Sequence, residues 1–128
     1  MRSLIVLSTR KTGEADVVEA WELMRWAMPP VAVVSRVHVD RVGGEGTLPV
    51  GLSWVFFVGG TKTAVMATWP DDSPAAVSLM LGLHRNLARP AAAPVLPARA
   101  LRQAILPLLA TKYRHPFYWA NYAVLGIG

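Results

Sequence analysis

The chain has no cysteine among its 128 residues. This absence excludes disulfide bonds, metal sites built from thiolates, and cysteine as a catalytic nucleophile. It also leaves the sequence without any marker of the redox compartment in which the protein works. An enzyme that depends on a thiolate is therefore excluded for this chain acting alone.

Long apolar runs are absent as well. Near the N-terminus only residues 4–7 are continuously apolar, which is short of the ~7 to 15 residues in the core of a secretory signal. The longest uncharged apolar stretch, residues 46–61, contains Pro49 and several glycines, and it falls below the ~20 residues of a membrane-spanning helix. We therefore expect no signal peptide, no membrane anchor and a cytoplasmic location.

Acidic residues are missing from the second half of the chain. All eight Asp and Glu residues lie within residues 1–72, whereas residues 73–128 carry Arg and Lys without any acid, and the formal net charge is +5. Such a basic surface suits nucleic acid or an acidic protein. The bases are scattered singly, however, and nucleic-acid sites gather them in a stripe. Solvated helix faces are therefore the favoured interpretation, and nucleic acid is not the partner we expect.

The residues that are present form one α/β domain in our interpretation. A hydrophobic content of 53% in 128 residues is enough for one modest core. Short apolar or β-branched runs predict strands at residues 3–8, 31–39, 63–69 and 122–127. Apolar residues at helical spacing predict helices at residues 14–28, 74–87 and 101–109. Residues 48–58 fit either a strand, by their Trp, Phe and Val content, or a helix that ends at Gly59 and Gly60. This alternation predicts a sandwich in which helices flank a mainly parallel sheet.

Two details of the predicted helices are specific. Ser73 and Pro74 suit the N-cap and the first helical position, and Pro107 should kink the last helix. The helix after Ser73 has a stripe of larger residues at helical spacing, which we expect to be buried: Val77, Met80, Leu81, His84 and Leu87. In a parallel sheet chemistry gathers at the carboxyl ends of the strands, here residues 8–13 and 69–73.

Several motifs occur in an order that is typical of one family. They are LSTRKTG at residues 7–13, GEG at 44–46, GLSWVF at 51–56, WPDD at 69–72, LM at 79–80, ALRQA at 100–104 and HPFYWA at 115–120. Together they resemble the C-terminal half of CHAT domains, the caspase-like, separase-related cysteine peptidases of clan CD. The resemblance implies a single, truncated caspase-like domain over residues 1–128, a three-layer sandwich with an insertion at residues 14–42. It also favours a helix over a strand at residues 48–58.

The truncation suggests how the sheet is completed. The strand that would flank residues 3–8 in the family lies before Met1, and an open apolar edge invites association. We therefore predict that the insertion folds back as a right-handed βαβ unit. The predicted strand order is 31–39, 3–8, 63–69, 122–127.

The resemblance also implies which residues would form the active site. The family's nucleophilic cysteine matches Arg10, and its general base is a histidine on the strand that would precede Met1. A guanidinium stays protonated and has no available lone pair, so Arg10 cannot attack a carbonyl carbon. Asp72 matches the acid that, in separase-like enzymes, sits in the pocket for a basic substrate residue. Helix capping beside Ser73 is its simpler role.

Three function classes follow. The first is a catalytically inactive CHAT module that acts through a protein partner or self-association. The second is a subunit of a cysteine endopeptidase whose histidine and cysteine come from another chain. The third is a basic module that binds nucleic acid or acidic proteins. His38, His84 and His115 lack metal-ligand spacing, so we expect them to be structural and expect no metal or cofactor.

Overall fold

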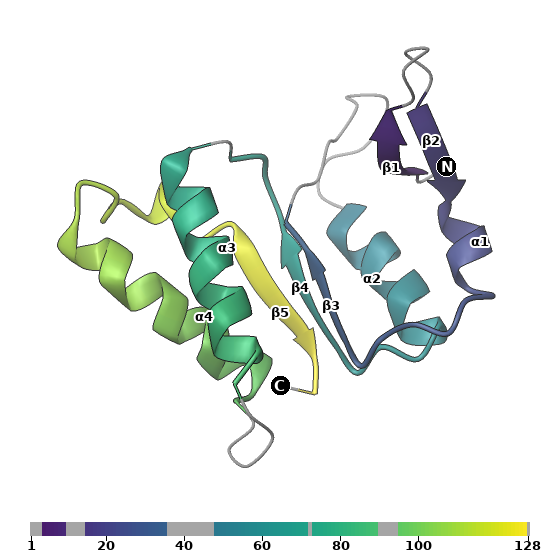
Figure 1. Cartoon of the computed structure of the whole chain (residues 1–128). Helices are drawn as coiled ribbons and strands as arrows, with labels where there is room; N and C mark the ends of the chain where they lie inside the picture. The colour runs from purple at the N-terminus through teal and green to yellow at the C-terminus, as the bar shows by residue number, and fades with distance from the viewer. Residues whose placement is uncertain (1–3, 10–14, 36–47, 72, 90–94, 128) are drawn as a thin grey trace.

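The computed structural model describes residues 4–9, 15–35, 48–71, 73–89 and 95–127, which form a mixed α/β structure (Figure 1). Its strands are β1 (Leu4–Thr9), β2 (Ala15–Glu19), β3 (Val31–Val34), β4 (Thr63–Ala67) and β5 (Tyr122–Gly126). Its α-helices are α1 (Ala20–Leu23), α2 (Leu48–Val58), α3 (Pro74–Leu87) and α4 (Pro97–Ile105). Two short 3-10 helices, η1 (Leu106–Ala110) and η2 (Pro116–Tyr118), follow α4.

The described strands form two separate sheets. β3 pairs in parallel with β4, and β4 pairs antiparallel with β5, which gives the order β3-β4-β5. β1 pairs antiparallel with β2 in a two-stranded sheet. Figure 1 shows α2 on one side of the three-stranded sheet and α3 and α4 on the other. The three-stranded sheet is mixed, with one parallel and one antiparallel pair, so the prediction of a mainly parallel sheet is not confirmed.

The predicted strand order is confirmed for the strands at 63–69 and 122–127, which pair as β4 and β5, and is wrong for the other two. The strand at residues 31–34 pairs directly with β4, with Val31 opposite Thr63, and β1 does not lie between them. β1 pairs instead with β2, with Leu4 opposite Glu19 and Thr9 opposite Ala15. An antiparallel neighbour only a few residues away in the chain costs less loop-closure entropy than a distant strand, which favours this local pairing.

The predicted helix at residues 14–28 is also wrong for most of its length. The spacing of its apolar residues fits a helix, but the β-branched pair Val17 and Val18 belongs to β2, where it lies opposite residues of β1. β-branched residues are stiff at χ1 and favour a pleated strand. The helical part is the single turn of α1, whose N-cap Glu19 donates its backbone N–H to Glu22 Oε2 over 2.8 Å.

The helix predicted at residues 48–58 is confirmed as α2. Two glycines end it, and Gly60 adopts a positive φ of 106° while its N–H donates to the Phe57 carbonyl. α2 packs on β4, all of whose residues are buried. None of the described helices is long and apolar enough to cross a membrane.

A core of small and medium side chains fills the space between the sheet and the α3/α4 pair. Its buried members are Val65, Ala67, Ala75, Leu79, Leu83, Ala100, Leu101, Ala104, Leu108 and Tyr122. Gly82 lets α3 and α4 approach closely, because a Cβ there would lie 3.2 Å from the Ala104 Cβ. α4 ends at Ile105, and the chain continues as the 3-10 helix η1 with Pro107 inside it, so the predicted helix changes type just before the proline.

The start of α3 is confirmed, but its buried face is not the predicted one. Ser73 is the N-cap, its Oγ accepts the Ala76 N–H, and Pro74 opens the helix. The fully buried residues of α3 are Ala75, Ala76, Leu79 and Leu83. From the predicted stripe, Val77 is 61% exposed, Leu81 is 53% exposed and His84 is exposed, whereas Met80 and Leu87 are partly buried. The buried face of α3 therefore lies one position away from the predicted stripe and packs in the cluster shared with α4.

Candidate functional site: a groove beside α3

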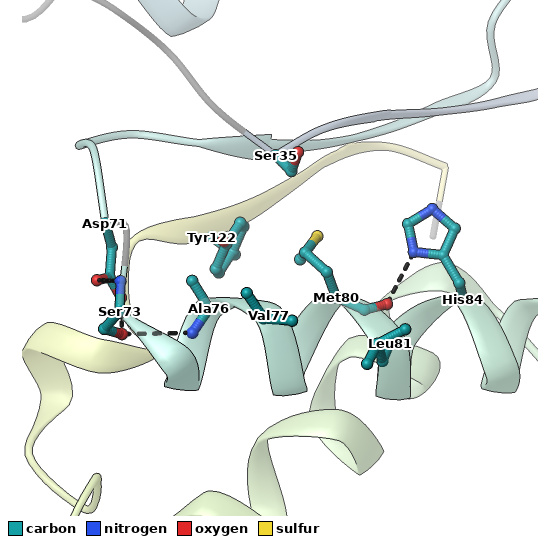
Figure 2. A pocket seen from close by; sticks show the side chains of 9 residues that line it. All are labelled: Ser35, Asp71, Ser73, Ala76, Val77, Met80, Leu81, His84 and Tyr122. Atoms are coloured by element: carbon teal, nitrogen blue, oxygen red, sulfur yellow. Dashed lines mark hydrogen bonds between the residues drawn. The ribbon is translucent and has the colours of Figure 1, made fainter.

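An open groove of about 510 Å³ lies beside α3, where β3 and β4 end (Figure 2). Its lining residues are Ser35, Asp71, Ser73, Ala76, Val77, Met80, Leu81, His84 and Tyr122. Ser35 directly follows β3, and Asp71 follows β4 by a few residues. The groove therefore lies at the carboxyl edge of the parallel pair, where α/β sheets commonly bind ligands.

The acid at one end of the groove is held by the α3 cap. Asp71 Oδ1 accepts the Ser73 N–H over 2.8 Å, and Asp71 Oδ2 accepts the Ser73 hydroxyl over 3.0 Å. This arrangement is an Asx-type turn ahead of a helix. The carboxylate is thus committed to the fold, and the Ser73 hydroxyl that donates to it has no free proton to give.

Sequence reasoning selected Asp72 here and missed Asp71. Asp72 lies outside the described residues, so the prediction for it stays untested. The signal for Asp71 was available, because an aspartate two residues before a serine N-cap is the spacing of an Asx turn. Asp71 therefore holds the N-cap residue, and the cap itself is made by the Ser73 hydroxyl.

Tyr122 forms the inner wall of the groove at the start of β5, and it is 8% exposed. Burial raises the pKa of its hydroxyl above the ordinary value of 10.0, hydrogen bonding by the Asn121 side chain opposes this shift, and the charge of Asp71 adds to it. Asn121 joins the ends of two strands: its carbonyl accepts the Thr68 N–H over 2.7 Å, and its Nδ2 donates to the Trp69 carbonyl over 3.3 Å.

The raised pKa of Tyr122 predicts a loss of stability at high pH. Because the folded-state pKa of Tyr122 lies above the unfolded value, its contribution to the free energy of unfolding is fully present below pH 10. This contribution is lost as the pH rises through the folded-state pKa. Urea unfolding at a series of pH values should therefore show a steeper alkaline decline for the wild type than for Tyr122→Phe. Equal slopes for the two proteins would contradict the assigned environment of Tyr122.

The two described histidines make local backbone contacts. His84 Nδ1 lies 2.8 Å from the Met80 carbonyl oxygen, so this nitrogen carries the hydrogen (Figure 2). His115 Nδ1 accepts the Phe117 N–H over 3.2 Å at the start of η2. Within the described parts of the chain no three His, Cys, Asp or Glu side chains gather as a metal site. The Ser73 hydroxyl donates to Asp71, and none of the hydrogen bonds of the described residues joins it to either ring.

The other residues predicted for the site are not brought together by the described structure. Arg10 and His38 lie outside the described residues. Thr9 ends β1 in the two-stranded sheet, whereas Trp69 follows β4 in the three-stranded one, so these two positions do not follow neighbouring strands of one sheet. The described groove is built at the end of the β3/β4 pair instead.

Comparison with known proteins gives one family. No curated protein and no solved structure matches the chain. A family model for the CHAT domain matches residues 1–127, and this match includes the motifs at residues 7–13 and 115–120. The chain belongs to the CHAT domain family.

Proposed function

We propose that this chain is a catalytically inactive CHAT module that acts through protein contacts. The observation that carries the proposal is chemical: Arg10 stands where the family's nucleophile is expected, and the sequence holds no cysteine that could replace it. A permanently protonated guanidinium cannot form the covalent acyl intermediate of a cysteine peptidase.

The hydrogen bonds of the groove support the same proposal. A replacement nucleophile needs a neighbouring base that is free to take its proton. Ser73 donates to a carboxylate that also holds the N-cap residue, and none of the hydrogen bonds of the described residues joins its hydroxyl to an imidazole. These side chains stabilise α3, and a relay from hydroxyl to imidazole is not among their contacts.

The family membership supports descent from a caspase-like peptidase. We propose that the chain keeps a caspase-like sandwich as a scaffold, with α2 on one side of the sheet and the α3/α4 pair on the other. A scaffold that keeps its core after losing its nucleophile can still present surfaces to other proteins. The proposed activity is therefore recognition without bond cleavage.

A peptidase assay tests the proposal. The purified wild-type chain, at high micromolar concentration, should release no fluorophore from peptides with Arg or Lys before the reporter group, because it has no activated nucleophile. A denatured sample of the same protein is the matched blank. Saturable turnover that elutes together with the chain in size-exclusion chromatography would overturn the proposal.

A second candidate, a basic module that binds nucleic acid, rests on the charge asymmetry. Residues 73–128 are basic without any acid, and Lys112 Nζ lies 5.2 Å from the centre of the Tyr113 ring. Binding to a labelled single strand that weakens steeply with salt would favour this candidate. Binding that is absent at low salt would remove it.

A further inference from the structure

α3 carries a second apolar face that the rest of the described chain does not cover. Its first face packs into the core through Leu79 and Leu83. The second face, which lines the groove, contains Val77, Met80 and Leu81, and two of these three side chains are more than half exposed. These positions share one side of the helix. Isolated apolar residues on a surface are common, but a cluster that lines a groove indicates a contact site.

Beyond Ser35, which lines the groove, the strand β3 is a partly exposed apolar edge of the described sheet. α3 has α4 on one side, through Gly82 and Ala104, and the groove on the other. Val31 and Val33 lie opposite Thr63 and Val65 in the register, so they share the sheet face that α3 covers. Both valines are only partly buried. A corner between a helix and the edge of a sheet is the place that an additional helix fills in layered α/β structures.

Two arginines near the His84 end of the groove indicate what charge a bound helix should carry. Arg85 continues the exposed row of Val77 and Leu81 at an interval of four residues, and Arg89 follows just after the end of α3. Both arginines are exposed, and neither forms an ion pair within the described parts of the chain. The sequence supplies no acid between residues 73 and 128. A partner that covers the apolar face would therefore place acidic groups beside these arginines most favourably.

We propose that the groove binds an amphipathic helix of a protein partner, with the helix's apolar face on Val77, Met80 and Leu81 and its acidic residues beside Arg85 and Arg89. The inference rests on the proposed function, because it names the partner class of a non-catalytic module. From Ser73 to His84 the groove follows about three turns of α3, or ~16 Å at 1.5 Å per residue. A docked helix of similar length makes its contacts at every third or fourth residue.

Titration with two designed peptides tests the inference. Both peptides form a helix of about four turns with one leucine stripe, and they differ only in carrying Glu or Lys at the remaining positions. In NMR spectra of the ¹⁵N-labelled chain, the Glu peptide should shift resonances of residues 31–35 and 73–89 and bind at least about tenfold more tightly than the Lys peptide. Equal affinity of the two peptides, or shifts confined to other elements, would overturn the inference.

Two variants with matched controls test whether the Glu peptide binds in the groove. Leu81→Glu and Arg85→Glu should each weaken binding of the Glu peptide by about tenfold or more, because one buries a charge and the other reverses one. Leu109→Glu and Arg102→Glu change exposed residues of the same types on η1 and α4, and they should leave binding unchanged. All four substitutions are at exposed positions, so well-dispersed spectra should persist.

The outcomes separate this inference from the proposed function. Shifts of the α3 resonances that depend on the concentration of the chain alone would indicate a second copy in the groove and overturn the partner helix. If the wild-type chain does not bind the Glu peptide and also shows no peptidase turnover, the groove is not a binding site, but the proposal of an inactive module is unaffected. If the chain shows peptidase turnover and also binds the Glu peptide, the proposal of an inactive module is overturned, but the groove remains a binding site.

Discussion

Replacing Leu79 by alanine should lower the free energy of unfolding by about 2 to 5 kcal/mol. Leu79 is completely buried in the cluster between the sheet and α4, so the substitution removes apolar contacts and leaves a cavity. A domain of this size is stabilised by only about 5 to 15 kcal/mol, so the loss is a large share of the total. Urea unfolding followed by circular dichroism measures the change.

Leu81 is the matched control on the same helix. Its side chain is more than half exposed, so Leu81→Ala should change the free energy of unfolding by no more than about 0.5 kcal/mol. The comparison also tests the orientation of α3, because the apolar spacing in the sequence predicts that Leu81 is buried. A larger cost for Leu81→Ala than for Leu79→Ala would show that the helix is turned the other way.

Replacing Gly126 by alanine should cost about 3 kcal/mol in the free energy of unfolding. Gly126 ends β5 with a φ of 105°, and a Cβ built there would overlap the Lys62 carbonyl oxygen. That oxygen accepts the Ile127 N–H over 3.1 Å, and the neighbouring Thr63 hydroxyl donates to the Ile127 carbonyl. The added methyl group would therefore strain the backbone and push apart the hydrogen-bonded end of the sheet.

Gly60 separates the two causes of this cost. Its φ of 106° is nearly the same, but the nearest atom to a Cβ there is the Met28 carbonyl oxygen at 4.0 Å. Gly60→Ala should therefore lose only the conformational part, about 1 to 2 kcal/mol. Thermal or urea unfolding of both variants gives the comparison, and equal losses would mean that the close approach to Lys62 has no energetic weight.

The parts of the fold that were predictable are those that local chemistry determines. Ser73 and Pro74 have the residue types of a helix start, and the structure places the start there. Pro107 removes a backbone donor, and the α-helix ends just before it. The strand at residues 63–67 is a short apolar run and is buried throughout. In each case a few neighbouring residues are sufficient to decide the structure.

The predictions that were wrong concern features that depend on which segments of the chain pair or pack together. Val17 and Val18 fit one face of a helix by spacing, but pairing with β1 makes them a strand, because tertiary contacts override weak local preference. The two apolar faces of α3 could not be ranked from spacing alone, since both have helical period. The face that is buried contains Ala75, Leu79 and Leu83, which pack with residues of α4 in the core. Sequence patterns therefore located α3 but not its orientation.

The candidate site was predictable in part for the same reason. The stretch that follows β4 was expected to be near any site, and Asp71 and Ser73 do line the groove. The contribution of Ser35 and Tyr122 depends on β3 and β5 flanking β4, and the predicted strand order did not place β3 there. Residues that come from strands distant in the chain can be assigned to a site only once the sheet order is known.

Arg10→Cys is the sharpest test of whether the chain is an inactive module, because the variant would carry the only thiol in the chain. We expect no turnover of peptides with Arg or Lys before the reporter group, since a cysteine without a positioned histidine is not activated. We also expect alkylation by iodoacetamide with the pH dependence of an ordinary thiol, whose pKa is about 8.5. Peptide hydrolysis by Arg10→Cys, with a thiol that is already ionised below about pH 6, would show instead that the rest of a peptidase site is present in the chain.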